Sequence, residues 1–488
     1  MVTDLNFRMI YSVTNFLGEC MFYKLKRFTF VRNINDYLQI IDKRNDTEII
    51  GDYISYLFAK ELSYEFKNID ILVHKICEKF DDSTDFNIVK NDAINFYEKL
   101  FEFGLVSKKE NLDALEIEQT VNNEKKYANI LLPKEEYKIY QKVRKEKPCL
   151  QHIMIEITKI CNERCIHCYI PHENKNIMMD DNIFYDIVNQ AVELGTVVSF
   201  KISGGECMLH PLFKSFIKYI KEKGFALTVL TNLTLLDDET INILREGSYS
   251  DVQVSLFSLN PKIHDKITTV KGSFDKTIKN LDKLYHAGID VSIATQVMEI
   301  NKDSIEDLYK YTKKYNFKFR CDWTIIPQED KNCSNLSCRV ENLSAYEDIC
   351  KLRIKYDEGY KEELKEELSY PPKSEDKHLC NAGTNGIAID ANLNVHPCAG
   401  WGINVGSLKV QKLLEIWEKS ELLSKIRNVV LRDFPKCKNC NIRNLCSICM
   451  AHADLEKNAE NFKFEMPEYS CKMYNVIYNT IRKELSLS

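Results

Sequence analysis

Strand-like and helix-like segments alternate between residues 150 and 328, and this alternation constrains the fold of the 488-residue chain more than any other feature. Apolar, β-branched runs predict strands near 153–157, 197–202, 225–230, 252–256, 291–297 and 319–323. Amphipathic segments between them predict helices near 181–194, 212–223, 238–245, 274–287 and 303–315. Strands joined by helices form parallel sheets through right-handed crossovers, so we expect an α/β fold whose sheet curves into a partial (β/α)6 barrel.

Cysteine is the second informative residue type, because the chain contains 18 of them. The N-terminus, Met1-Val-Thr-Asp-Leu-Asn, lacks a basic segment followed by an apolar run, so we expect no secretion signal. In a long chain of this kind, clustered cysteines indicate metal ligation rather than disulfides. The first cluster, Cys161, Cys165 and Cys168, follows the first predicted strand, at the end of the barrel where active sites lie.

Charge and hydropathy exclude two classes of partner. The formal net charge is only −5, which provides no global field that would recruit nucleic acid or anionic lipid. No stretch reaches the roughly 18 uninterrupted apolar residues of a membrane span. We therefore expect a cytoplasmic protein with neither a nucleic acid nor a membrane as its partner.

The spacing Cys161-x3-Cys165-x2-Cys168 places three thiolates on one tight loop. Three thiolates can hold a cubane iron–sulfur cluster by three of its irons, which leaves the fourth iron open. An open iron is what S-adenosylmethionine needs for chelation by its amine and carboxylate, and one electron then cleaves it to a 5′-deoxyadenosyl radical. The alternative is a zinc site, for which His167 or His172 would supply a fourth ligand.

In these residues the chain resembles the radical S-adenosylmethionine (SAM) superfamily, because Ser203-Gly-Gly-Glu206 is similar to its GGE motif. The resemblance implies that Gly204 and Gly205 let the backbone approach the methionine end of SAM and that Glu206 accepts from its ammonium. Ser255 on the fourth strand and Asn232 after the third stand where family members often contact the cofactor, although ordinary structural roles are equally open to them. His264 after the fourth strand either lines the substrate cavity or lies in a solvated loop.

The C-terminal region resembles the SPASM extension of some radical SAM enzymes. Its signature is seven cysteines in the family's order: Cys380, Cys398, Cys437, Cys440, Cys446, Cys449 and Cys471. By this resemblance, one auxiliary 4Fe–4S cluster would be held by Cys437, Cys440, Cys446 and Cys471. The other would be held by Cys380, Cys398 and Cys449. Two zinc ribbons are the alternative.

Three departures from the SPASM pattern concern the ligands. The last pair is spaced Cys446-x2-Cys449 where the family usually has three intervening residues, and Leu393 stands where a glycine is usual. Both leave the pairing of ligands open. In addition, no cysteine follows Cys380 within a few residues, which suggests that one auxiliary cluster has an open iron. We hypothesise that this iron binds a substrate thiolate.

The N-terminal module, residues 1–105, has strand-rich runs at 28–32 and 37–41 around a turn, followed by helices near 71–80 and 88–101 that end at Gly104. This winged-helix-like outline resembles the peptide-recognition element of ribosomal-peptide maturases. The resemblance implies that the module captures a leader peptide as an added strand. A DNA-binding winged helix is the alternative, but residues 1–104 hold 13 basic and 17 acidic side chains, which disfavours it.

The expected domain organisation follows from these segments. Residues 1–105 form the leader-recognition domain, 106–148 a linker with a helix near 135–145, 149–328 the radical SAM barrel, 329–374 a bridging region, and 375–488 an irregular, Cys-rich SPASM domain with one helix near 410–427.

The predicted function is that of a peptide maturase with three 4Fe–4S clusters and SAM. It would act on a ribosomal precursor peptide such as that of a bacteriocin and receive electrons from a low-potential donor such as ferredoxin or flavodoxin. The preferred product is a thioether between a Cys sulfur and a carbon. A carbon–carbon cross-link, or maturation of a folded protein of the sulfatase or quinoprotein type, is the alternative.

Overall fold

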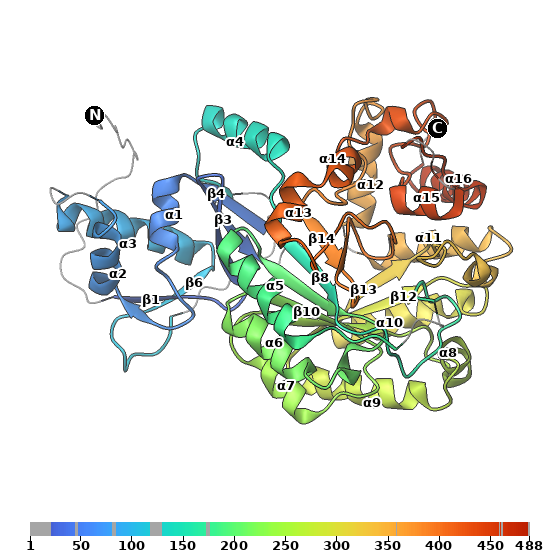
Figure 1. Ribbon diagram of the computed structural model, residues 1–488, viewed down its shortest axis with the longest axis horizontal. Coiled ribbons are helices and arrows are strands. Elements are labelled where there is room, and N and C mark those ends of the chain that lie inside the picture. Colours follow the sequence, from blue (N-terminus) through green and yellow to red (C-terminus); the bar gives the residue numbers. More distant parts are fainter. Residues whose placement is uncertain are drawn as a thin grey trace. The chain divides into compact units, whose positions relative to one another are not determined.

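The computed structural model describes residues 21–43, 47–80, 84–117, 129–171, 176–357, 359–457, 459 and 462–486. The chain divides into two compact units, Met1–Pro133 and Lys134–Ser488, and each is described by itself (Figure 1). In the described ranges, no helix combines the length and the apolar character that crossing a membrane requires.

The described residues of the N-terminal unit form two small sheets and three helices. Its strands are β1 (Phe22–Leu25), β2 (Thr29–Ile34), β3 (Tyr37–Asp42), β4 (Thr47–Gly51), β5 (Lys67–Asn68), β6 (Val106–Lys109) and β7 (Asn129–Ile130). Its helices are α1 (Tyr53–Ala59), α2 (Ile69–Cys77) and α3 (Phe86–Glu102). The strand orders are β2-β3-β4-β7 and β5-β1-β6. Along the chain, strands come both before and after the three helices.

The predicted hairpin and helix end are confirmed in this unit. Asn35 and Asp36 both have positive φ angles, 51° and 65°, which is the backbone of a tight turn between paired strands β2 and β3. Gly104, with φ 69°, follows α3 as the helix-ending glycine.

The segment expected to be a linker is built into this unit. Strand β6 pairs with β1, and β7 pairs with β4, so residues 106–109 and 129–130 belong to the two sheets. The compact unit therefore extends to Pro133 rather than ending near residue 105. Only the expected helix remains outside it, as α4 (Lys134–Glu146) of the second unit.

The second unit contains the predicted parallel sheet. Its first six strands are β8 (His152–Glu156), β9 (Ser199–Ser203), β10 (Ala226–Thr231), β11 (Ser250–Ser255), β12 (Asp290–Gln296) and β13 (Lys318–Asp322). They pair in parallel in the order β13-β12-β11-β10-β9-β8. The order is linear, with β8 and β13 not paired to each other, so the barrel is partial, as predicted.

Helices connect and cover these strands. They are α5 (Asp181–Leu194), α6 (Phe213–Glu222), α7 (Asp238–Arg245), α8 (Pro261–Thr268), α9 (Ser273–His286) and α10 (Ile305–Tyr315), and Figure 1 shows α5, α6, α7 and α9 along the outer face of the sheet. Their apolar faces are buried in the core that they share with the strands. Neighbouring helices also pack on each other, since the buried rings of Phe184 on α5 and Phe216 on α6 stack with centroids 3.8 Å apart. The side chains on the opposite face of the strands face the interior of the barrel.

The SPASM region extends the same sheet. Strand β14 (Gly386–Ile389) pairs in parallel with β8, and β15 (Asn394–His396) and β16 (Gly406–Ser407) continue the order antiparallel. The barrel and the C-terminal region therefore share one nine-stranded sheet and one hydrophobic core.

The bridging region contains the helices α11 (Ala345–Tyr356) and α12 (Tyr360–Ser369). The expectation of an irregular C-terminal region with one helix is wrong, because that region contains α13 (Leu413–Lys419), α14 (Glu421–Arg427), α15 (Met450–Lys457) and α16 (Glu468–Glu484). The expected helix near 410–427 is broken at Ser420, whose side chain accepts from Leu423 N as the N-cap of α14.

Candidate functional site

The loop after β8 carries the first cysteine cluster. Its backbone is tied to α8, because Arg164 N donates to Thr268 O at 3.0 Å and Ile166 N donates to Ile267 O at 3.0 Å. Within the loop, Cys168 N donates to Cys165 O at 3.1 Å. Cys161, Cys165 and Cys168 all line one cavity of about 950 Å³ inside the barrel. The sequence prediction that these three residues share a loop at the carboxyl end of the strands is therefore met.

The two glycines after β9 hold this loop in place. Gly205 N donates to Thr158 O and Glu206 N donates to Ile160 O, both at 2.8 Å. A Cβ on Gly204 would collide with Thr158 O, and a Cβ on Gly205 would lie 2.6 Å from Ile160 C and 2.7 Å from Lys159 O. The glycines also line the cavity, but the close approach that demands them is to the backbone that leads into Cys161.

Glu206 lies behind the loop rather than on the cavity wall. Its side chain is fully buried, and its oxygens accept from Thr231 Oγ1 at 2.7 Å, Asn232 N at 2.8 Å and Met208 N at 3.1 Å. Burial raises the pKa of the carboxyl group, and these bonds offset part of that rise. In this conformation Glu206 joins the ends of two neighbouring strands, which the sequence prediction of an ammonium contact did not anticipate.

Asn232 and Ser255 face the same cavity as the triplet, as predicted for cofactor contacts. Asn232 is largely committed within the protein: its amide donates to Asn162 Oδ1 at 2.9 Å, and its Oδ1 accepts from Thr234 N at 3.0 Å. The His264 expectation is wrong in both of its forms. That residue is 1% exposed within α8, does not line the cavity, and accepts from Phe257 N at 3.3 Å.

A zinc site at the triplet would require His167 or His172 as its fourth ligand. His167 lines the cavity with its ring against Phe257, 4.8 Å between centroids, and burial lowers its pKa to about 4. His172 lies outside the described residues. In the ranges that the structure describes, no three His, Cys, Asp or Glu side chains are close enough to share one metal ion. Three thiols on one loop that all line one cavity are a donor set that fits a cubane cluster with one open iron.

Several cavity residues were missed from the sequence. Lys201, Gln253, Arg320 and Asp322 line the cavity from β9, β11 and β13. A signal for them existed: Lys201 lies two residues before Ser203, and Gln253 two before Ser255, so each shares a strand face with a predicted cavity residue. These side chains give the barrel interior a polar and charged wall.

The seven C-terminal cysteines fall into two sets. Burial first, and then neighbouring thiols of the set Cys437, Cys440, Cys446 and Cys471, together raise the pKa of Cys446 to about 12 and that of Cys437 to about 11. Burial also raises the pKa of Cys398, to which Cys449 and Cys380 add, and Cys380 likewise raises that of Cys449. These groupings are the ones that the SPASM resemblance implies for the cluster ligands, and the ligand assignment itself stays a prediction.

The two sets differ in their access to the barrel. Cys449 lines the same cavity as the triplet, whereas no member of the four-cysteine set does. Because Cys449 lines the cavity, the three-cysteine set offers a ligand site at the cavity wall. Thiols with raised pKa values are protonated at neutral pH, so a metal that binds them must displace protons.

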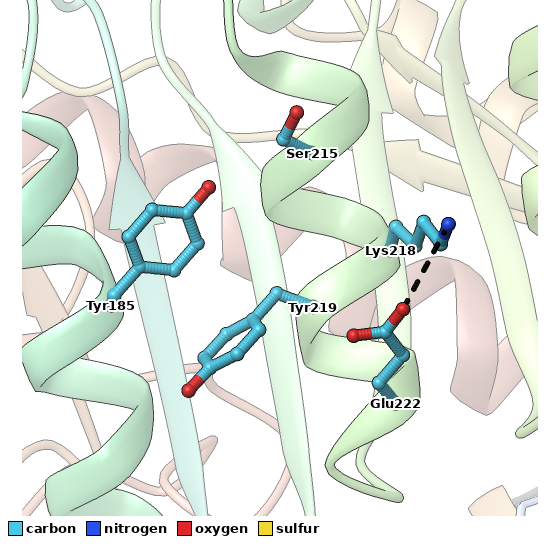
Figure 2. A pocket seen from close by; sticks show the side chains of 5 residues that line it. All are labelled: Tyr185, Ser215, Lys218, Tyr219 and Glu222. Atoms are coloured by element: carbon cyan, nitrogen blue, oxygen red, sulfur yellow. Dashed lines mark ion pairs between the residues drawn. The ribbon is translucent and has the colours of Figure 1, made fainter.

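A second hollow, of about 400 Å³, lies on the outer surface of α5 and α6 (Figure 2). Tyr185 and Tyr219 meet edge to face there, with ring centroids 4.9 Å apart, and Lys218 pairs with Glu222 at 3.9 Å. Ser215 completes its lining. It contains none of the predicted site residues, so the barrel cavity is the candidate site.

Comparison with known families agrees with this geometry. The model of the Radical SAM superfamily matches residues 155–312. The model of the SPASM iron–sulfur cluster-binding domain matches residues 380–441. The chain therefore contains one segment that is similar to the radical SAM superfamily and one that is similar to the SPASM domain. Both matched ranges lie in the second unit, and together they contain the triplet and four of the seven C-terminal cysteines.

Two curated relatives are each similar to part of the chain. The antilisterial bacteriocin subtilosin biosynthesis protein AlbA of Bacillus subtilis is 27% identical over 260 residues, which are 52% of this chain but only 56% of AlbA. An AdoMet-dependent heme synthase of Methanosarcina barkeri is 22% identical over 320 residues, 61% of this chain and 90% of that protein.

Two of the solved structures with a similar fold contain a bound peptide. Streptococcus suis SuiB bound to precursor peptide SuiA superimposes with a TM-score of 0.61 at 18% identity, covering 92% of this chain and all of SuiB. An anSMEcpe structure with bound AdoMet and a Cp18Cys peptide gives a TM-score of 0.54 at 17% identity, covering 69% of this chain and 98% of that one. At these identities the similarity establishes the fold.

Proposed function

We propose that this protein is a radical SAM/SPASM enzyme that modifies a ribosomally synthesised precursor peptide by radical chemistry. The observation that carries the proposal is the shared cavity: the thiols of Cys161, Cys165 and Cys168 and that of Cys449 face one space of about 950 Å³. A radical source and a second ligand site that share a cavity suit a substrate which reacts with both. The bacteriocin role in the name of AlbA and the peptide in the SuiB structure favour a peptide substrate.

In this proposal the triplet holds the catalytic 4Fe–4S cluster. With SAM bound, a cluster held there would supply the one-electron reduction that converts SAM to a 5′-deoxyadenosyl radical, which is able to remove a hydrogen atom from a substrate. Gly204 and Gly205 fix the Cys161 loop and present backbone to the cavity, while Ser255 and Asn232 offer polar side chains to SAM. Glu206, buried behind them, positions the loop and the end of β10.

The three-cysteine set favours a thioether product. Cys437, Cys440, Cys446 and Cys471 would supply four ligands to one auxiliary cluster, whereas Cys380, Cys398 and Cys449 supply only three to the other. A substrate cysteine thiolate fits the remaining ligand position, because Cys449 lies at the cavity wall. A carbon–carbon cross-link is the second candidate product, and maturation of a folded protein the third.

The N-terminal unit is proposed to bind the leader of the precursor peptide through residues 1–105. Strand β2 is an outer strand of its sheet, and an outer strand can accept a peptide as an added strand. The 17 acidic and 13 basic side chains of residues 1–104 disfavour a nucleic acid. We place the protein in the cytoplasm, with a low-potential ferredoxin or flavodoxin as its electron donor.

The test is anaerobic reconstitution with iron, sulfide and SAM, followed by incubation with the precursor peptide encoded in a short neighbouring reading frame. We expect release of deoxyadenosine and a peptide that has lost two hydrogen atoms for each new bond, read by mass spectrometry. Alkylation of the product's free thiols distinguishes a thioether, which consumes one thiol per link, from a carbon–carbon bond, which consumes none.

Two controls complete this test. The Cys449→Ala variant should still release deoxyadenosine but form no thioether, and a precursor without its leader should react poorly. Deoxyadenosine release with an unchanged peptide mass would contradict the peptide substrate, and full activity on a leaderless core would favour a folded-protein substrate.

A further inference from the structure

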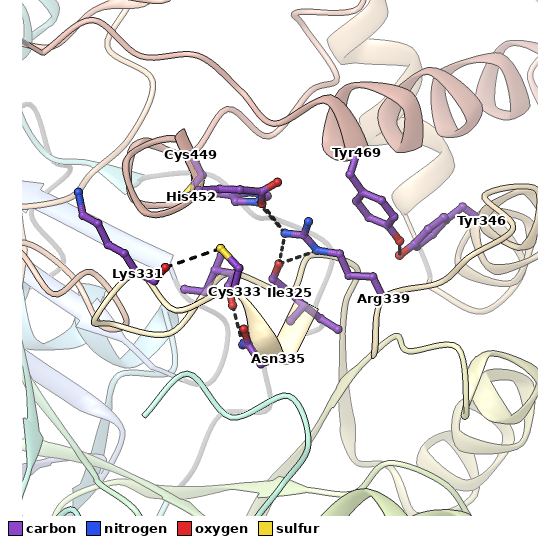
Figure 3. Close-up of polar contacts among 11 residues, drawn as sticks. Ile325, Lys331, Cys333, Asn335, Arg339, Tyr346, Cys449, His452 and Tyr469 are labelled. Carbon is purple, nitrogen blue, oxygen red and sulfur yellow. Dashed lines mark hydrogen bonds and ion pairs between the residues drawn. The ribbon is translucent and has the colours of Figure 1, made fainter. Parts of the chain in front are cut away.

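A buried arginine from the bridging region lies behind Cys449. Arg339 is 9% exposed, and its Nε and Nη2 atoms donate to Ile325 O at 3.2 and 2.7 Å (Figure 3). Its guanidinium also lies 4.8 Å from the centre of the Tyr469 ring on α16. Because Ile325 lines the barrel cavity, Arg339 is attached directly to the cavity wall.

The charge of Arg339 is balanced by a carboxylate on α15. Glu456 Oε2 accepts from Arg339 Nη2 at 2.7 Å and lies 3.0 Å from His452 Nε2, which itself lies 3.1 Å from Arg339 Nη2. Burial acts to raise the pKa of Glu456, but the bonds from His452 and Arg339 hold it at about 2, so the carboxylate is ionised at neutral pH. The pair therefore contributes one buried positive charge and one partly buried negative charge.

This network is attached to the proposed cluster ligand. Helix α15 begins at Met450, directly after Cys449, and His452 N donates to Cys449 Sγ at 3.4 Å. Cys449 and His452 both line the cavity, and His452 is 1% exposed. His452 thus contacts a thiol that faces the substrate cavity, and the charged pair contacts His452 from one helical turn further along α15.

We propose that the Arg339–Glu456 pair keeps the charge beside the auxiliary cluster at Cys380, Cys398 and Cys449 balanced, so that neither charge shifts its reduction potential, while it holds α15 against the cavity wall. This inference rests on the proposed function, which places a cluster on those cysteines. The reduced cluster carries one more negative charge than the oxidised one, and nearby buried charge is poorly screened. A balanced pair leaves the potential close to what the thiolates give, and removing one member shifts it according to the sign of the charge left behind.

The test compares variants of opposite charge. Arg339→Gln leaves a partly buried negative charge and should lower the midpoint potential; Glu456→Gln leaves a positive charge and should raise it. We expect each to change the oxidised-to-reduced ratio at a fixed potential by about tenfold, which for one electron is about 59 mV. Arg339→Lys keeps the charge and should change the ratio by less than about threefold, and the double variant Arg339→Gln/Glu456→Gln should return to the wild-type value.

The measurement is a redox titration followed by EPR on reconstituted full-length protein. A Cys161→Ala/Cys165→Ala/Cys168→Ala background removes the first cluster, so the remaining signals belong to the auxiliary ones. Only one of the two auxiliary couples should respond. The inference would be overturned if both single variants shifted the midpoint potential equally. It would also be overturned if neither variant shifted the midpoint potential of the couple whose signal Cys449→Ala abolishes.

The proposed function can fail separately from this inference. If Cys449→Ala retains both auxiliary signals, Cys449 holds no cluster, and the premise falls with the inference. If Cys449→Ala loses one signal but the charge variants leave it unmoved, only the inference falls. Should Arg339→Gln not fold, Glu456→Gln and the double variant still give opposite predictions, since one raises the potential and the other restores it.

Discussion

The contact between Gly205 and the loop that precedes Cys161 gives a quantitative prediction for Gly205→Ala. The added Cβ would lie 2.6 Å from Ile160 C and 2.7 Å from Lys159 O, whereas ordinary contact begins at 3.4 Å. The loop must therefore move by about 1 Å, which overpacks the site at a cost of about 1–3 kcal/mol. The move also stretches the bonds from Gly205 N to Thr158 O and from Glu206 N to Ile160 O, about 1 kcal/mol each.

The expected cost of Gly205→Ala is therefore about 3–5 kcal/mol. Because the displaced residues lead directly into Cys161, we also expect the reconstituted variant to hold less iron at the triplet. Denaturant unfolding followed by circular dichroism measures the first effect. Iron analysis in a background without the seven C-terminal cysteines measures the second.

Gly224→Ala is the matched control. Gly224 has a φ of 74°, and a Cβ there would meet nothing within 4 Å, so only backbone strain of about 1–2 kcal/mol is expected. Its iron content should equal that of the wild type. If Gly205→Ala is no less stable than Gly224→Ala and binds as much iron, the assignment of the glycines to the Cys161 loop is refuted.

The remaining predictions concern the cysteine sets, a buried histidine and the extent of the fold. Cys437→Ala and Cys449→Ala should each lose the iron of one auxiliary cluster, and their double variant the iron of both, as measured by iron analysis; equal losses in the single and double variants would contradict two separate sets. The pKa of His264 is lowered from 6.5 to about 4 by burial, so the unfolded state binds a proton in this window that the folded state does not, and stability should fall as pH drops from 6.5 to 4. The His264→Gln variant should lack up to about 3 kcal/mol of this loss in urea titrations across that range; an unchanged pH profile would exclude it. A chain truncated after residue 374 leaves β8 without its partner β14, and size-exclusion chromatography should show aggregates rather than a monomeric barrel.

The barrel was largely predictable because its signal is local. Helices α5 and α7 begin and end where their amphipathic pattern predicts, and Asp180 provides the N-cap of α5 by accepting from Asn182 N and Ile183 N. The short helix α8 was missed, since its eight residues contain too few apolar positions to stand out. Helix α16 was missed although its signal was present, in the four-residue spacing of Met473, Ile477 and Ile481.

The site was predictable in its residues but not in their partners. The triplet and the GGE loop each follow a predicted strand. Their places in the barrel therefore depend only on the strand order, which could be predicted from the sequence. The role of Glu206 depends on Thr231 and Asn232, which come from a neighbouring strand and meet it only in the folded sheet. Likewise, Cys449 lies three residues from Cys446 in sequence yet raises the pKa of Cys398 instead, because α15 turns it toward the barrel.

The pairing of β14 with β8 has a consequence for how the chain is made. About 230 residues separate Glu156, the last residue of β8, from Gly386, the first of β14. At a ribosomal rate of about 5–20 residues per second, the edge of β8 waits about 10–50 s for its partner strand to be synthesised. During that time the nascent barrel exposes an unpaired edge at the strand that leads into the Cys161 loop, which is the edge a chaperone would need to cover. Cluster insertion at the triplet is therefore expected after chain release, once the SPASM strand has completed the sheet.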